Sequence, residues 1–145
     1  MKKQGQLTGM RGEFLAAAEL SKLGFIVCTT SRNAQGADLL ITDLECTKVF
    51  SIQVKTNAAS RKWWLIGEKG EKIVSETHIY VLINIKEACK KNPKEEVEYF
   101  VVPSKVIAEK LIYERNKGPK QGEWWSVLIE DMIPYKDKWN YFKRD

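Results

Sequence analysis

Hydrophobic residues recur with a helical period near the start of the chain. From Thr8 or Gly9 to Leu23, leucine, phenylalanine and alanine return every three or four positions, and the pattern ends before Gly24. A glycine directly after such a run is a usual helix C-cap, so the spacing predicts an N-terminal helix. Because several of its residues are alanines, we expect this helix to pack closely against a sheet.

Three segments with strand-like patterns follow the helix. They cover residues 25–30, 37–42 and 49–56, and a polar connection at 43–48 joins the last two as a hairpin. The third segment alternates strictly, so its apolar and polar side chains face opposite ways. The apolar set is Phe50, Ile52 and Val54, and the polar set is Ser51, Gln53 and Lys55. The pattern predicts an antiparallel meander.

The second half of the chain is predicted to add further strands and one more substantial helix. The strands are expected at 63–66, 78–85, 99–102 and 124–129, with a turn at 67–70 and a surface loop at 86–96. A helix is predicted from about Ser104 to Asn116, because Pro103 stands at its first turn, and a short helix is predicted beyond Pro134. This order favours an α/β domain over residues 1–145, with a central mixed sheet and flanking helices.

Composition narrows the class of protein. The chain has 145 residues, 43% hydrophobic and 30% charged, which fits one globular domain and excludes disordered, collagen-like and coiled-coil classes. No apolar run is long enough to cross a bilayer, and no signal-peptide core follows the basic N-terminus, so we expect no membrane association. Three widely spaced cysteines argue against a disulfide scaffold or a zinc site and favour a cytoplasmic protein.

The net charge of +5 lies mostly in the N-terminal part of the chain. Residues 1–62 contain 9 basic and 5 acidic side chains. A localised positive charge suits a polyanionic partner, since phosphate contacts release counterions. Many domains that bind no nucleic acid are equally basic, so charge alone leaves both alternatives open.

Four polar residues occupy positions that direct them toward the sheet or onto one face of it. Glu13 begins a helical stripe of alanine and leucine, Asp38 opens a strand, and Gln53 and Lys55 share a strand face. This arrangement predicts a magnesium site, with two carboxylates, an amide oxygen and a lysine on a helix and neighbouring strands. Mg²⁺ takes oxygen ligands and retains reactive waters. The lysine would orient or deprotonate the attacking water, or neutralise charge on the phosphorane.

The segments Gly36-Ala37-Asp38 and Ile52-Gln53-Val54-Lys55, preceded by Glu13 on a helix, resemble the signature of the PD-(D/E)xK nuclease superfamily. The spacing is similar to that of archaeal Holliday-junction resolvases, and the resemblance covers residues 9–57. It implies a restriction-endonuclease-like fold and an endonuclease that needs Mg²⁺ or Mn²⁺. It also implies that Asp38 and Gln53 bind the metal, that Lys55 is the catalytic lysine, and that Glu13 supports the metal or the lysine. Gln53 replaces the usual carboxylate, so its amide oxygen would coordinate a cation without adding charge.

Each of these residues also has a purely structural interpretation. Glu13 would complement the helix dipole, Asp38 would be a turn residue, and Lys55 would be a solvated lysine. For the whole chain, one alternative is a nuclease-fold protein without cleavage that binds nucleic acid or protein. Another is an immunity-type interaction protein whose basic face meets an acidic partner.

The expected partner is DNA, duplex or branched, and a homodimer is expected because one small nuclease domain cuts one strand at a time. Candidate phosphate contacts are Arg11, Arg32, Arg61 and Lys62. The run Arg61-Lys62-Trp63-Trp64 mixes basic and aromatic residues as base-stacking platforms do. One tryptophan of each adjacent pair is nevertheless expected to face the core, and the single histidine, His78, is predicted to be structural.

Overall fold

The computed structural model describes residues 2–31, 34–58, 61–117 and 122–143. The first half contains α1 (Lys2–Lys22), β1 (Ile26–Thr29), β2 (Leu39–Thr42), β3 (Val49–Asn57), β4 (Trp63–Leu65) and α2 (Lys69–Lys72). The second half contains β5 (His78–Lys86), β6 (Glu96–Pro103), α3 (Ser104–Lys110), β7 (Ile112–Asn116), β8 (Gly122–Leu128) and α4 (Ile129–Met132). The 3-10 turns η1 (Ile133–Tyr135) and η2 (Trp139–Phe142) follow.

The central sheet has five strands in the order β1-β2-β3-β5-β6. Strands β1, β2 and β3 form the predicted antiparallel meander, whereas β5 pairs with β3 in parallel and with β6 antiparallel. A parallel neighbour requires a crossover connection, which here contains β4 and α2. The parallel register places Tyr80 opposite Gln53.

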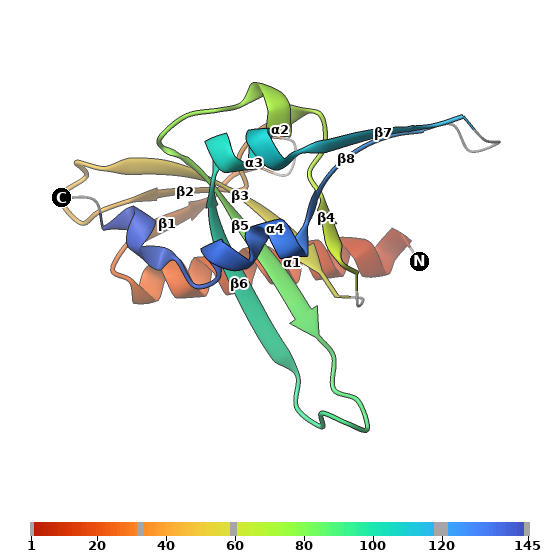
Figure 1. Ribbon diagram of the computed structural model, residues 1–145. Coiled ribbons are helices and arrows are strands. Elements are labelled where there is room, and N and C mark those ends of the chain that lie inside the picture. The colour runs from red at the N-terminus through yellow and green to blue at the C-terminus, as the bar shows by residue number, and fades with distance from the viewer. Residues whose placement is uncertain (1, 32–33, 59–60, 118–121, 144–145) are drawn as a thin grey trace.

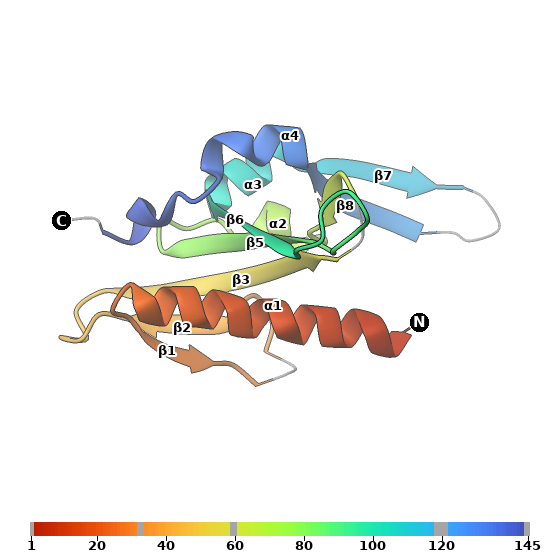
Figure 2. The ribbon, with the colours of Figure 1, turned by 90° about the horizontal axis from the view of Figure 1, so that it is seen from below.

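Two layers cover the two faces of this sheet (Figure 2). Helix α1 lies along one face, where Ala16 and Leu20 pack on Ile52 and Val54 of β3. The other face is covered by α2, α3, α4 and a second sheet of order β4-β8-β7, where Trp64 packs with Phe100. The molecule therefore has two apolar cores, one on each side of the central sheet.

Helix α1 approaches β3 most closely at Gly12. A Cβ atom at this position would lie 1.7 Å from Thr56 Oγ1, well inside the van der Waals distance. Only glycine allows the helix backbone to rest directly on the strand here. This contact fixes the height of α1 above the sheet, one residue before Glu13.

The predicted helix from Ser104 to Asn116 is only partly correct. Helix α3 ends at Lys110, and residues from Ile112 onward form β7, which pairs with β8. The aromatic rings of Tyr113 and Trp125 lie 5.0 Å apart across this pair. Such cross-strand contacts outweigh the local helix propensity of the segment. The predicted boundaries also shift elsewhere, since α1 begins at Lys2 and part of the predicted turn at 67–70 belongs to α2.

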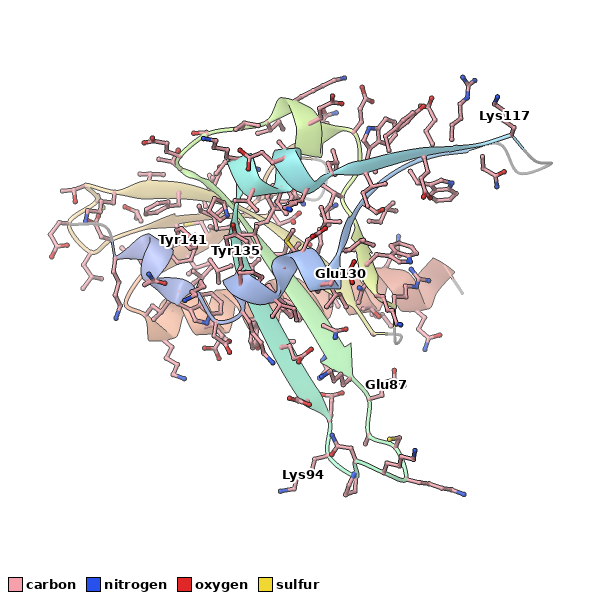
Figure 3. The ribbon with its side chains drawn as sticks, viewed as in Figure 1. Glu87, Lys94, Lys117, Glu130, Tyr135 and Tyr141 are labelled. Carbon is pink, nitrogen blue, oxygen red and sulfur yellow. The ribbon has the colours of Figure 1, made fainter. Side chains whose placement is uncertain are left out.

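The β7–β8 hairpin extends beyond the rest of the molecule, with Lys117 near its end (Figures 1 and 3). Of the two tryptophan pairs, Trp63-Trp64 places one ring in the core as predicted, whereas neither ring of Trp124-Trp125 belongs to a core cluster. Trp64 is 1% exposed and Trp63 36% exposed, whereas Trp125 is half-buried and Trp124 is exposed. Within the described part of the chain, no helix has the length and apolar character to cross a membrane.

Candidate active site

Asp38, Gln53 and Lys55 line one pocket of about 380 Å³ on the face of the central sheet away from α1. Its walls come from the segment before β2, from β3 and β5, and from the segment that leads into α2. The lining residues are Ala34, Gln35, Gly36, Asp38, Gln53, Lys55, Ile66, Glu68, Lys69, Ile73 and Tyr80. The structure thus brings together three of the four predicted catalytic residues.

The position of Asp38 follows from the end of the β2–β3 pairing. The ladder begins with Leu39 opposite Ile52, and the Asp38 N–H donates to the Ile52 carbonyl at 2.8 Å. Gly36, with a φ of +95°, provides the turn that brings the chain into this position. The Asp38 side chain therefore lies alongside β3, next to the backbone of Val54.

One oxygen of the Asp38 carboxylate is fully engaged by β3. Oδ2 accepts hydrogen bonds from Gln53 Nε2 at 2.6 Å and from the Val54 N–H at 2.7 Å. The described residues donate no hydrogen bond to Oδ1. Burial raises the pKa of Asp38 despite the opposing effects of the Val54 N–H and the Lys55 ammonium. A cation at Oδ1 would offset that desolvation.

Lys55 is half-buried, and burial lowers its pKa, although the nearby Asp38 carboxylate opposes the shift. Its ammonium group makes no hydrogen bond or ion pair with any residue that the structure describes. A lysine directed into a polar pocket without a protein partner is available to a substrate oxygen or to a water molecule. Its lowered pKa also makes proton transfer easier near neutral pH.

Gln53 stands beside Asp38 as a hydrogen-bond donor. A carboxylate at this position would repel Asp38, whereas the amide donates to it and stabilises the pair. Rotation of the amide group would exchange its nitrogen and oxygen and direct Oε1 toward a cation shared with Asp38. Among the described residues, no group of three or more His, Cys, Asp and Glu side chains is placed to hold a metal. One carboxylate and one amide oxygen still fit Mg²⁺, which binds proteins through few ligands and keeps several waters.

Glu13 lies elsewhere. It is half-buried on α1, which covers the opposite face of the sheet, and it is not among the residues that line the pocket. Its predicted role as a supporting acid remains a prediction. Its neighbour Gly12 contacts β3 at Thr56, one residue beyond Lys55.

The described candidates for DNA contact, Arg11, Arg61 and Lys62, are not among the residues that line the pocket. Arg11 forms a two-point ion pair with Glu95. Arg61 and Lys62 are exposed before β4, and the Arg61 guanidinium lies 5.2 Å from the centre of the Trp63 ring. Arg32 lies outside the described residues. The roles of these side chains in DNA binding remain predictions.

The polar pocket residues that were not predicted from the sequence are Gln35, Glu68, Lys69 and Tyr80. Lys69 of α2 donates to Gln35 Oε1 at 2.7 Å and so connects α2 to the segment before Asp38. Tyr80 enters the pocket from β5. Its strand is apolar on both faces, so the only signal in the sequence was one tyrosine in a buried run. Only the parallel pairing of β3 with β5 places it beside Gln53.

His78 is buried, and its predicted structural role remains a prediction, since its Nε2 has no partner among the described residues. It is 2% exposed, and its Nδ1 lies 2.7 Å from Ser51 Oγ on the polar face of β3. Burial lowers the pKa of His78, opposed by Ser51 and by the Asp38 carboxylate. The imidazole is therefore held neutral inside the sheet layer.

Two solved structures share this arrangement of elements. A bacterial homing endonuclease superposes with a TM-score of 0.57 and 15% identity over 94% of this chain and 89% of that one. The Holliday junction resolvase Hjc of the archaeal hyperthermophile Archaeoglobus fulgidus superposes with a TM-score of 0.53 and 16% identity over 88% of each chain. No family model matches the chain, and no curated protein matches it. At these identities the likeness establishes the fold, which is the restriction-endonuclease-like nuclease fold that the sequence predicted.

Proposed function

We propose that this protein is an endonuclease that hydrolyses DNA phosphodiester bonds with the help of Mg²⁺ or Mn²⁺. The observation that carries the proposal is the convergence of Asp38, Gln53 and Lys55 in one pocket of a nuclease fold. Within that pocket, Asp38 Oδ1 and the Lys55 ammonium have no partner among the described residues. A bound cation and a phosphate are the ligands that would satisfy an acceptor and a donor of this kind.

In this mechanism, Asp38 and the amide oxygen of Gln53 would hold the cation. The metal would supply Lewis acidity and make water a stronger nucleophile. Lys55 positions the attacking water or a non-bridging phosphate oxygen and stabilises the negative charge that develops on phosphorus. A water oxygen bonds to phosphorus, one P–O ester bond breaks, and the leaving oxygen takes up a proton.

The substrate that we propose is DNA, duplex or branched, and the acting form is a homodimer. The two structural neighbours are a homing endonuclease and a Holliday junction resolvase, and the chain carries its positive excess in residues 1–62. Candidate contacts to the DNA backbone are Arg11, Arg32, Arg61 and Lys62. The proposed compartment is the cytoplasm, with which the free, exposed Cys28, Cys46 and Cys89 are compatible.

A second candidate function is DNA or protein binding without cleavage. The observation that favours it is the Gln53–Asp38 hydrogen bond, which stabilises the Asp38 carboxylate without any cation. The two functions differ in one measurable respect, because only the nuclease converts its ligand.

The deciding experiment measures cleavage of supercoiled plasmid, linear duplex and a four-way junction in Mg²⁺, Mn²⁺ or EDTA. Lys55→Met is compared with Lys105→Met, which alters an exposed lysine of α3 outside the pocket. We expect metal-dependent cleavage that Lys55→Met lowers by about 10²-fold or more. Salt-sensitive DNA binding without cleavage by the wild-type protein would instead support the second function. Cleavage that is unaffected by Lys55→Met would contradict the proposed site.

A further inference from the structure

Tyr80 occupies a position in the pocket that the mechanism above does not use. Its side chain is 2% exposed, and it projects from β5 on the same face as Gln53, its opposite residue in the parallel register. It lines the pocket together with Asp38 and Lys55. The ring packs edge-on against His78 at 5.3 Å and belongs to the core between the central sheet and α3.

The hydroxyl of Tyr80 has no hydrogen-bond partner among the described residues. Buried tyrosine hydroxyls almost always find one. The described side-chain atoms that are both fully buried and unpartnered are Thr56 Oγ1 and His78 Nε2. Tyr80 Oη has no partner but is not one of these fully buried atoms. The hydroxyl therefore belongs to the small surface that Tyr80 exposes at the pocket wall.

Two donors in this pocket have no partner among the described residues, namely Tyr80 Oη and Lys55 Nζ. Asp38 Oδ2 already accepts from Gln53 and Val54, and Asp38 Oδ1 is the atom assigned to the cation. Burial and the Asp38 carboxylate raise the pKa of Tyr80 to about 12, so the hydroxyl keeps its proton at neutral pH. A tetrahedral phosphate presents several oxygens and can accept from two such donors at once.

We propose that Tyr80 is a substrate-contacting residue whose hydroxyl donates a hydrogen bond to a non-bridging oxygen of the phosphate in this pocket. The inference rests on the proposed function for its substrate class, a phosphodiester of DNA. It adds a phosphate contact from β5 to Asp38, which precedes β2, and to Gln53 and Lys55 of β3. The hydroxyl neither transfers a proton nor binds the cation in this role.

The test compares Tyr80→Phe with Tyr113→Phe. Each change removes one hydroxyl, but that of Tyr113 donates to Glu123 on the β7–β8 hairpin, outside the pocket. The first measurement is cleavage in Mg²⁺. The second is binding of thymidine 5′-monophosphate and of thymidine, which contains no phosphate; neither measurement depends on cleavage. Thermal unfolding verifies that both variants fold.

We expect Tyr80→Phe to unfold at an unchanged or higher temperature, since no protein hydrogen bond is lost. It should lower both kcat/KM and the affinity for thymidine 5′-monophosphate by about tenfold, as expected for a hydrogen bond to a charged group. The affinity for thymidine and the behaviour of Tyr113→Phe should not change. Wild-type phosphate affinity and rate in Tyr80→Phe would overturn the inference while leaving the nuclease intact.

Binding also separates this inference from the proposed function. A wild-type protein that binds thymidine 5′-monophosphate but never cleaves DNA would refute the nuclease. In that protein, a loss of phosphate affinity in Tyr80→Phe would still support the contact. A wild-type protein that does not distinguish thymidine 5′-monophosphate from thymidine would overturn both.

Discussion

The two faces of β3 differ completely in character, although their residues alternate along a single strand of nine residues. Phe50, Ile52 and Val54 are buried under α1 in an apolar core. Gln53 and Lys55 are half-buried and point the other way, into a pocket that other polar side chains also line. Because side chains alternate with a period of two, burying the apolar set under α1 forces the polar set onto the opposite face.

The comparison shows that one face of β3 contributes apolar packing to the stability of the fold, whereas the other face carries groups of the candidate active site. On the α1 side, contacts are apolar and close, down to the Gly12–Thr56 approach. On the pocket side, burial shifts the ionisable groups away from their charged forms, raising the pKa of Asp38 and lowering those of Lys55 and His78. Desolvated groups of this kind destabilise a fold unless a ligand binds them, so the two apolar cores, including the one under α1, must offset that cost.

The largest expected effect comes from truncating neighbouring residues on the two faces. Ile52→Ala should lower the free energy of unfolding by about 2–5 kcal/mol, since it leaves a cavity under α1. Gln53→Ala should cost about 1 kcal/mol, because Asp38 loses one donor and keeps the Val54 N–H. Urea unfolding of both variants gives the comparison. Equal losses at the two positions would contradict the division of roles.

A smaller effect is expected when Gln53 is changed to the carboxylate usual in the superfamily that this sequence resembles. Without metal, Gln53→Glu should destabilise the fold, because two carboxylates then face each other in place of a hydrogen bond. With Mg²⁺ the added charge should strengthen binding roughly tenfold. Calorimetric titration with Mg²⁺ measures this affinity.

The control for this titration is Asp38→Asn in the Gln53→Glu background. It removes the other predicted ligand and should return the affinity to the wild-type level or below. An affinity that Gln53→Glu leaves unchanged would mean that residue 53 does not face the cation.

The smallest expected effect is the pH dependence of stability that arises from the buried His78. Burial lowers the pKa of His78, so the unfolded chain binds a proton more readily than the folded one. Stability should therefore be constant above the ordinary pKa of 6.5 and decrease below it, by at most about 1.4 kcal/mol per pH unit. Glu98, with its pKa lowered to about 2 by Lys136, Lys86 and Asn84, contributes a loss only at more acidic pH.

Unfolding curves between pH 7.5 and 5 in roughly half-unit steps measure this dependence. His78→Gln should make stability independent of pH in the upper part of this range, because the chain has one histidine. Asp38→Asn should steepen the wild-type decrease, since the Asp38 carboxylate is the charged group that favours protonated His78. If the stability of His78→Gln still decreases over this pH range, groups other than His78 cause the decrease.

The sequence alone determined those features that depend on local periodicity. The apolar period of α1, the glycine turn before Asp38 and the strict alternation of β3 are short-range patterns. They were sufficient to predict the meander, the fold class and the grouping of Asp38, Gln53 and Lys55. Sequence reasoning failed at 112–116, where the local pattern favours helix and the pairing with β8 imposes a strand.

The tertiary structure alone decided which distant segments meet. The parallel pairing of β3 with β5 placed Tyr80 beside Gln53, and the crossover brought Lys69 to Gln35. It also placed α1, and with it Glu13, on the face opposite the pocket. A period of two determines which face a side chain takes within its own strand, but it carries no information about which strand lies next to it. That choice depends on burying both apolar faces of the central sheet at once, a property of the whole chain.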